Sequence, residues 1–364
     1  MRIAYVINSV EGGGAAFPVP DITRLMRDAG HEVALFALLR RDGRALPAVT
    51  ASGLQAAVRA GSRQDHVAAL RWLDRQVASW RPDLIWTSLT RATVMGQMIG
   101  LKQRIPVVSW QHSAGLSPAN TRLLRTLRGL SRLWVADSRC VLAFMHDRLA
   151  IPPGRAMLWP IFRADPGCPV ARPWQAGEPV RIGSLGRLHP VKGYDHLCRA
   201  LAILKADTTL PPFEITIAGE GAERPHLESL IRQYGLTNLH LAGFQDAVPP
   251  FLAMQHGYVQ PSLHEGLCIG VHQAMQAGLA PIASAVGEIP YTVQDSMSGW
   301  LVPPRDPPAL AAALARALRR PDRLASMGQA ARTQVLDRFA PERFAAAGRA
   351  ILDRVQPASR PTRS

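Results

Sequence analysis

The chain has 364 residues, 47% hydrophobic and 19% charged, which suits two globular domains and excludes a disordered or low-complexity protein. Forty-two Lys and Arg against 27 Asp and Glu give a net charge of +15. No apolar run reaches the roughly 18 residues of a transmembrane helix, and the start lacks a signal-peptide cleavage site, so we expect a protein that is cytoplasmic or peripheral on the inner face of the cytoplasmic membrane.

Strand-like apolar runs alternate with helix-like stretches along the whole chain, which predicts parallel sheets covered by helices. In the first half we expect strands at residues 3–7, 33–38, 84–87, 106–110 and 133–136. In the second half we expect them at residues 180–185, 213–218, 239–242, 257–260 and 281–283. The pattern predicts an α/β protein of two Rossmann-like domains.

A stretch rich in Pro and Gly separates the two halves and reads as a linker. We therefore expect a first domain at residues 1–163, a linker at 164–179 and a second domain at 180–340. Helices are expected at about 308–319, 322–337 and 341–355, the last packing back on the first domain. The tail, 356–364, is expected to be disordered.

The first expected strand runs into a loop with three adjacent glycines, Gly12 to Gly14. Such a loop before a helix lets backbone amides approach an anion, although it also occurs as a simple tight turn. The second strand ends without the acidic residue that binds an NAD ribose. Arg40 and Arg41 follow it and could hold the 2′-phosphate of NADP instead, but the residues of the second half argue against a dinucleotide enzyme.

Residues 1–160 carry most of the excess charge, with 21 basic against 10 acidic residues. This excess suits an anionic partner, but it also suits an arginine-rich proteome. Between the strands at 106–110 and 133–136, arginines recur at helical spacing opposite Leu123, Leu127, Leu130 and Trp134. This basic helix would bind an anionic membrane surface or a polyprenyl diphosphate, or pack in the core with a solvated face; its arginines are Arg122, Arg125, Arg128 and Arg132. No nucleic-acid-binding motif accompanies the charge, so no nucleic acid is expected.

Two segments of the second half carry residues suited to a sugar diphosphate. Arg187 and Lys192 follow the strand at 180–185, where they could hold a diphosphate as it departs. Glu265 follows the strand at 257–260 and begins a Glu-Gly step, which sets a carboxylate and amides at a helix start. Taken singly, the cations also fit a solvated surface and the carboxylate a helix cap.

Taken in order, these segments resemble glycosyltransferase family 4, retaining enzymes of the GT-B fold, in which two Rossmann-like domains face each other across a cleft. The resemblance spans nearly the whole chain. It rests on Gly13-Gly14-Ala15, Gly30-His31-Glu32-Val33, His112, Gly186-Arg187, Lys192-Gly193, Gly219-Glu220-Gly221, Gly243-Phe244 and residues 261–278.

The resemblance implies a hexosyltransferase that uses a UDP or GDP sugar, without a cofactor, and a saccharide or polyprenyl-linked acceptor in polysaccharide or lipopolysaccharide synthesis. Its catalytic residues would be Arg187 and Lys192 on the diphosphate and Glu265 on the sugar. The remaining donor-binding residues would be Gly13 and Gly14 at the diphosphate, His112 beside the sugar, Gly266, Leu267 and Cys268 through their amides, and Phe244 at the base. With no Asp-x-Asp step and no His spacing for a metal, we expect metal-independent transfer.

Gln273 departs from the family pattern, because a second Glu eight residues after the first usually binds the nucleotide ribose. An amide still bonds a ribose hydroxyl but carries no charge. This substitution keeps open a family member that binds sugar nucleotides without transfer. A GT-B relative with other chemistry, such as an epimerase, is a separate alternative.

Overall fold

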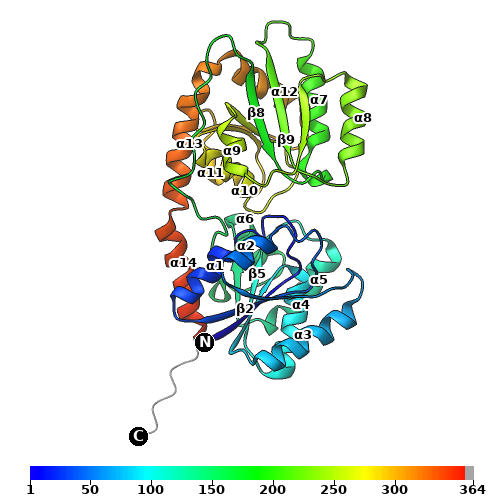
Figure 1. The fold of residues 1–364 in the computed structure, drawn as a ribbon, viewed down its shortest axis with the longest axis vertical. Coiled ribbons are helices and arrows are strands. Elements are labelled where there is room, and N and C mark those ends of the chain that lie inside the picture. Colours follow the sequence, from blue (N-terminus) through cyan, green and yellow to red (C-terminus); the bar gives the residue numbers. More distant parts are fainter. Residues whose placement is uncertain (357–364) are drawn as a thin grey trace. The chain divides into compact units, whose positions relative to one another are not determined.

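A computed structural model describes residues 1–356, so most of the tail predicted to be disordered lies outside the described residues. The chain divides into two compact units (Figure 1). Unit 1 comprises Met1–Ile161 together with residues 342–356, and unit 2 comprises Phe162–Pro341.

Unit 1 is built on a parallel sheet, which within residues 1–356 has seven strands in the order β3-β2-β1-β4-β5-β6-β7. The strands are β1 (Arg2–Ile7), β2 (Glu32–Ala37), β3 (Gln55–Val58), β4 (Leu84–Ser88), β5 (Val107–Gln111), β6 (Leu133–Ala136) and β7 (Ala156–Leu158). The helices are α1 (Val19–Asp28), α2 (Leu46–Ala51), α3 (His66–Trp80), α4 (Thr90–Gln103), α5 (Pro118–Leu127), α6 (Arg139–Asp147) and α14 (Pro341–Val355).

Unit 2 repeats this plan with a six-stranded parallel sheet in the order β10-β9-β8-β11-β12-β13. Its strands are β8 (Val180–Leu185), β9 (Phe213–Ala218), β10 (Leu239–Gly243), β11 (Gly257–Gln260), β12 (Ala280–Ser284) and β13 (Trp300–Val302). Its helices are α7 (Tyr194–Leu204), α8 (Arg224–Tyr234), α9 (Val248–Ala253), α10 (Ile269–Gln276), α11 (Ile289–Thr292), α12 (Pro307–Arg319) and α13 (Leu324–Arg338). The prediction of two Rossmann-like domains is confirmed.

The central strands are apolar runs because helices cover both faces of each sheet. Ile3 to Ile7 of β1 are fully buried, and so are Leu84 to Ser88 of β4. In both units the strand order reverses beside the first strand of the sheet, between β1 and β4 and between β8 and β11. Ligands of such sheets bind beyond the carboxyl ends of the strands at this point.

Helix α14 packs on unit 1. The Phe344 ring lies 5.2 Å from that of Trp159. A Cβ atom at Gly348 would lie 2.5 Å from the Trp159 ring and 2.8 Å from Leu25, so this glycine lets the helix approach closely. Figure 1 shows α14 alongside α1.

The segment predicted as a linker packs on unit 2. The Ala171 amide donates to the Ala277 carbonyl at 2.8 Å. Arg172 donates to Glu178 at 2.7 Å, which closes the loop that leads into β8.

The prediction of one basic helix continuing to Trp134 is wrong. Helix α5 ends at Leu127, a 3-10 turn covers Arg128–Leu130, and Trp134 lies in β6 with its indole N–H on the Arg128 carbonyl at 3.1 Å. The inward residue of α5 is Leu124, which is fully buried, whereas Leu123 is 43% exposed. Arg122 and Arg125 therefore lie on a helix, while Arg128 lies on the turn and Arg132 beyond it.

Candidate functional site

Lys192 and Glu265 meet at the switch point of the unit 2 sheet. Lys192 lies seven residues after the end of β8, and Glu265 follows β11 by five. The Lys192 ammonium donates to Glu265 Oε1 at 2.6 Å, and the two side chains are 21% and 9% exposed. Two residues 73 positions apart in the sequence thus form one largely buried ion pair.

Gly193 makes this pairing possible. The 3-10 turn Pro190–Lys192 ends on Gly193, whose φ of +65° lies in the left-handed region that glycine adopts without strain. A Cβ atom there would lie 2.1 Å from the Pro261 carbonyl oxygen. Beside it, the Leu263 amide donates to the Val191 carbonyl at 2.8 Å. Direct backbone packing therefore brings Lys192 to the segment that carries Glu265.

The Glu265 carboxylate keeps Lys192 charged. Burial alone would lower the pKa of Lys192, but the attraction and hydrogen bond to Glu265, together with smaller contributions from neighbouring groups, outweigh it, and the pKa lies well above its ordinary value. The site therefore holds a fixed ammonium next to a carboxylate, an arrangement suited to a ligand with both phosphate and hydroxyl groups.

Arg187 is exposed just beyond β8, and its backbone is supported by a second glycine motif. A Cβ atom at Gly219 would lie 1.9 Å from the Gly186 carbonyl oxygen, and one at Gly221 would lie 2.2 Å from that of Leu188. The Gly-Glu-Gly step thus lets β9 and the loop after β8 approach closely. Its Glu220 pairs with Arg224 at 2.9 Å.

Gly266, Leu267 and Cys268 lead from Glu265 into α10. The Gly266 carbonyl accepts from the Glu288 amide at 2.9 Å, and a Cβ atom at Gly287 would lie 2.5 Å from that oxygen. Cys268 caps α10 with φ +65°, and burial raises the pKa of its thiol, so the thiol stays neutral. Helix α10 also carries the partly exposed Gln273, whereas Phe244 follows β10 and is also partly exposed.

His272 of α10 is a buried neutral imidazole. Its Nδ1 lies 2.9 Å from the Cys268 carbonyl oxygen, which can only accept, and its Nε2 lies 3.1 Å from Thr292 Oγ1. Burial, with a smaller contribution from Arg338, lowers the pKa of His272 to about 4.

This depressed pKa predicts a loss of stability in acid. Between pH 6.5 and about 4 the unfolded imidazole binds a proton that the folded one does not, so stability falls as pH falls through this window. From pH 7.5 to 5 wild type should lose about 2 kcal/mol more of its free energy of urea unfolding than His272→Gln. Carboxylates titrate in both proteins and cancel in the comparison, so equal losses would contradict the prediction.

In unit 1 the predicted glycine loop follows β1. The Gly12 amide donates to Asp42 Oδ1 at 2.9 Å, and the Gly13 carbonyl accepts from the Ala16 amide at 3.1 Å. A Cβ atom at Gly13 would meet no atom of residues 1–356 within 4 Å, so packing among them does not demand a glycine there. Gly14 is exposed. The loop thus leaves open space beside Gly13 at the carboxyl end of β1.

His112 lies directly after β5 and is held on three sides. Its Nε2 lies 2.7 Å from Ser88 Oγ, its Nδ1 lies 3.4 Å from Asp137 Oδ2, and its ring stacks on Trp110 at 5.4 Å. Burial raises the pKa of Asp137. Ser88 is the last residue of β4, and Asp137 directly follows β6. These two strands are the neighbours of β5, so the sheet itself sets the orientation of this imidazole.

The sequence interpretation overlooked three polar residues behind Glu265, namely Tyr258, Gln260 and Ser262. Ser262 Oγ donates to Glu265 Oε1 at 2.7 Å. The sequence did contain a signal for them: polar residues stand at every second position along a strand that is buried on both faces and continue past its end to Ser262.

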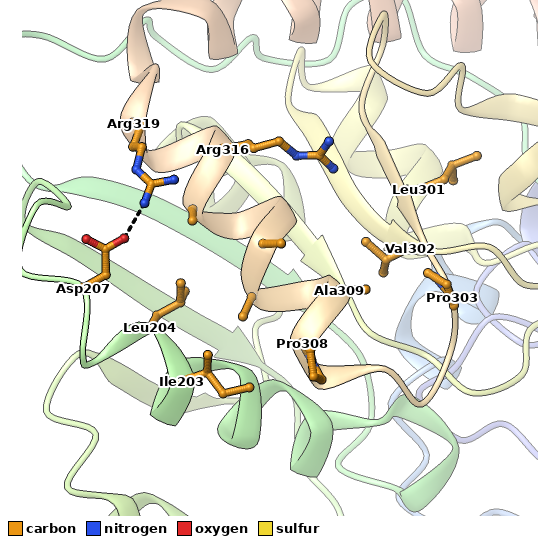
Figure 2. Close-up of a pocket in the computed structure, with 13 residues that line it drawn as sticks. Ile203, Leu204, Asp207, Leu301, Val302, Pro303, Pro308, Ala309, Arg316 and Arg319 are labelled. Atoms are coloured by element: carbon orange, nitrogen blue, oxygen red, sulfur yellow. Dashed lines mark hydrogen bonds and ion pairs between the residues drawn. The ribbon is translucent and has the colours of Figure 1, made fainter.

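A separate apolar groove of about 610 Å³ lies between α7, β13 and α12, and none of the predicted site residues lines it. Figure 2 shows Ile203, Leu204 and Val302 along this groove, with Arg319 paired to Asp207 at its edge.

Two family models match the chain. Residues 12–162 match Glycosyltransferase Family 4, and residues 173–334 match Glycosyl transferases group 1.

Curated relatives align with part of the chain. Amylovoran biosynthesis glycosyltransferase AmsK of Erwinia amylovora is 34% identical over 38% of this chain and 36% of its own length. 2-Deoxystreptamine glucosyltransferase of Streptomyces kanamyceticus is 31% identical over 50% of this chain and 47% of its own. D-inositol 3-phosphate glycosyltransferase of Salinispora tropica is 28% identical over 79% of this chain and 63% of its own length. These matches thus span between about a third and two thirds of the relatives' length.

Solved structures share the fold along nearly the whole chain. Anabaena HepE in complex with UDP-glucose superposes with a TM-score of 0.83 at 20% identity, covering 97% of this chain and 99% of HepE. Sucrose-phosphate synthase from Thermosynechococcus elongatus superposes with a TM-score of 0.78 at 18% identity, covering 97% and 98%.

Proposed function

The chain belongs to glycosyltransferase family 4, and we propose that it is a retaining hexosyltransferase that moves a sugar from a nucleotide diphosphate sugar to a saccharide or lipid-linked saccharide acceptor. The ion pair of Lys192 and Glu265 at the switch point of unit 2 carries the proposal. In this proposal the cation binds the diphosphate and the adjacent carboxylate accepts from sugar hydroxyls.

The chemical step needs the bond between the anomeric carbon and the diphosphate oxygen to break while the acceptor oxygen bonds to that carbon. We assign Arg187 and Lys192 to the diphosphate, where their charge offsets that of the leaving nucleotide, without a metal ion. Glu265 accepts from donor-sugar hydroxyls, and the amides of Gly266, Leu267 and Cys268 bind sugar or phosphate. With retention, the acceptor attacks from the face that the diphosphate leaves, and the phosphate takes the acceptor proton.

The other predicted residues have secondary roles in this proposal. Gln273 bonds the ribose and the backbone at Phe244 contacts the base. In unit 1, Gly13 and Gly14 approach the diphosphate, and His112 contacts the donor sugar. UDP is the first nucleotide to test, because Anabaena HepE, which shares the fold, was solved with UDP-glucose.

A panel of UDP, GDP and ADP sugars tests the function, with nucleotide release and the anomeric configuration of the product as readouts. One donor should release its nucleotide only when an acceptor is present, and the product should keep the donor's configuration. If no sugar nucleotide is turned over and none shifts the melting temperature, the proposed function is wrong. Donor conversion without any acceptor would indicate an epimerase instead.

For the acceptor we propose a role in cell-surface polysaccharide synthesis, since the amylovoran glycosyltransferase is among the relatives. No helix within residues 1–356 is long and apolar enough to cross a bilayer. We propose that α5, with Arg122 and Arg125 exposed beside the exposed Leu123, lies on an anionic membrane surface.

Replacing Arg122 and Arg125 by Ser should weaken binding to liposomes containing anionic lipid by about tenfold or more, at roughly 1 kcal/mol per charge. The matched control replaces the exposed Arg320 and Arg323 of unit 2 by Ser, which removes the same charge. Equal binding by the two double variants in a sedimentation assay would contradict the membrane role of α5.

A further inference from the structure

Strand β11 and the segment directly after it carry polar side chains that reach from the end of β8 to Glu265. Tyr258, Gln260 and Ser262 alternate along the chain and are fully buried. Tyr258 Oη lies 2.7 Å from Gln260 Oε1, Gln260 Nε2 lies 2.9 Å from Ser262 Oγ, and Ser262 Oγ lies 2.7 Å from Glu265 Oε1. Buried polar groups are costly unless bonded, and here each contact lies within hydrogen-bond distance.

The direction of every bond in this row follows from its two ends. At one end the Leu185 amide donates to Tyr258 Oη at 3.0 Å, and the Tyr258 hydroxyl gives its own hydrogen to Gln260 Oε1 at 2.7 Å, since the alternative acceptor, the Leu185 carbonyl oxygen, lies farther away at 3.4 Å. Burial raises the pKa of Tyr258 well above its ordinary value, so this hydrogen stays in place. At the other end a carboxylate can only accept, so Ser262 must donate to Glu265.

Gln260 satisfies both ends only in one orientation. Its carbonyl oxygen faces Tyr258 and its amide nitrogen faces Ser262, which leaves the Ser262 hydrogen for Glu265. The side chain at residue 260 therefore has to accept on one side and donate on the other, as an amide does and a carboxylate does not.

We propose that Gln260 is a positioning residue for the donor sugar: through Ser262 it holds Glu265 as an anionic acceptor in one orientation. Ser262 and Lys192 both donate to Oε1 of Glu265, at 2.7 and 2.6 Å, which fixes the carboxylate from two sides. The inference rests on the proposed function, in which Glu265 accepts from sugar hydroxyls.

The row also ties Glu265 to the other half of the site. Leu185 ends β8 two residues before Arg187, and its amide begins the row. The end of β8 leads to Arg187, the cation assigned to the diphosphate. This row of hydrogen bonds thereby links the end of β8 to Glu265, the carboxylate assigned to the sugar.

The test compares Gln260→Met, Gln260→Glu and Tyr258→Phe with wild type. Affinities are measured by calorimetry for UDP and UDP-glucose, or for the donor that the panel identifies and its free nucleotide. Gln260→Met removes both polar contacts at similar size, and Gln260→Glu turns the Ser262 hydroxyl away from Glu265. Both variants should bind the sugar nucleotide about tenfold to a hundredfold more weakly than wild type and bind the free nucleotide with unchanged affinity. Tyr258→Phe keeps the core filled and should show a smaller loss of the same kind.

Gln97→Met is the matched control, because Gln97 is a buried amide that donates to Ser131 in unit 1 at 2.7 Å. It should lower stability without altering the preference for sugar nucleotide over nucleotide. If all variants keep that preference while wild type transfers sugar, the proposal for Gln260 is overturned. If Gln260→Met and Gln260→Glu fail to fold, Tyr258→Phe decides by the same criterion.

A ligand-free measurement separates this proposal from the proposed function. The carboxyl ¹³C resonance of Glu265 and the amide resonance of Leu185 should both move in Gln260→Met and stay unchanged in Gln97→Met. These shifts with no turnover of any sugar nucleotide would overturn the function and keep the hydrogen-bond row. Turnover by wild type without these shifts would overturn the row and keep the function.

Discussion

Replacing Lys192 by Ala is expected to lower kcat/KM for the donor by about a hundredfold to a thousandfold, as loss of one preorganised group at a developing charge does. The ammonium that offsets the departing diphosphate disappears. The same change leaves Glu265 largely buried without its counter-charge, which should also lower the free energy of unfolding by about 2–4 kcal/mol. Donor kinetics and urea unfolding measure the two effects separately.

A double variant distinguishes catalysis from stability. Lys192→Met with Glu265→Gln removes both charges of the pair, so it should recover most of the lost stability and none of the activity. Lys192→Arg keeps the charge and should keep the fold. If the double variant regains both stability and turnover, Lys192 acts only as the structural partner of Glu265, and its assignment to the diphosphate is wrong.

The alternation of strands and helices was predictable because it depends on local patterns. The fully buried run from Ile3 to Ile7 reads as a strand from composition alone. The edge strands β3, β7 and β13 were not predicted. They have four, three and three residues, and none of them is buried along its whole length, unlike the similarly short β6 and β11. Their pairing depends on the strand next to them, which a local pattern does not contain.

The basic helix failed for a related reason. Spacing placed four arginines on one face, but Gly129 follows the helix closely and the Trp134 indole bonds the Arg128 carbonyl from within β6. A tertiary contact therefore ended the helix where periodicity continued it. Arg122 and Arg125 keep their predicted helical positions, and Arg132 does not.

The candidate site was predictable only in part. The resemblance to glycosyltransferase family 4 predicted Lys192 and Glu265 as site residues, although they lie 73 residues apart in the sequence. The row behind Glu265 was overlooked, because its members bond one another and serve no ligand directly. The glycines of the site were more informative, because a glycine beside a predicted ligand-binding residue indicates that another backbone segment packs closely there.

Gly193→Ala is expected to destabilise unit 2 by more than about 3 kcal/mol and to separate Lys192 from Glu265. The left-handed backbone itself costs a non-glycine residue only about 1–2 kcal/mol. The larger part comes from the new Cβ atom, which would lie 2.1 Å from the Pro261 carbonyl oxygen and must push apart the two segments that carry the ion pair. Urea unfolding and donor turnover of the folded variant measure both consequences.

Gly235→Ala is the matched control for this prediction. Gly235 has a φ of +59° against +65° for Gly193, so the cost of the left-handed backbone is the same in both variants. The new Cβ atom at residue 235, however, would meet the tip of the flexible Lys205 side chain at 2.9 Å and no backbone atom of the described residues. It should lose about 1–2 kcal/mol and keep full turnover. Equal losses in the two variants would mean that the glycine is required for its backbone angle alone. The contact with Pro261 would then not be what brings Lys192 to Glu265.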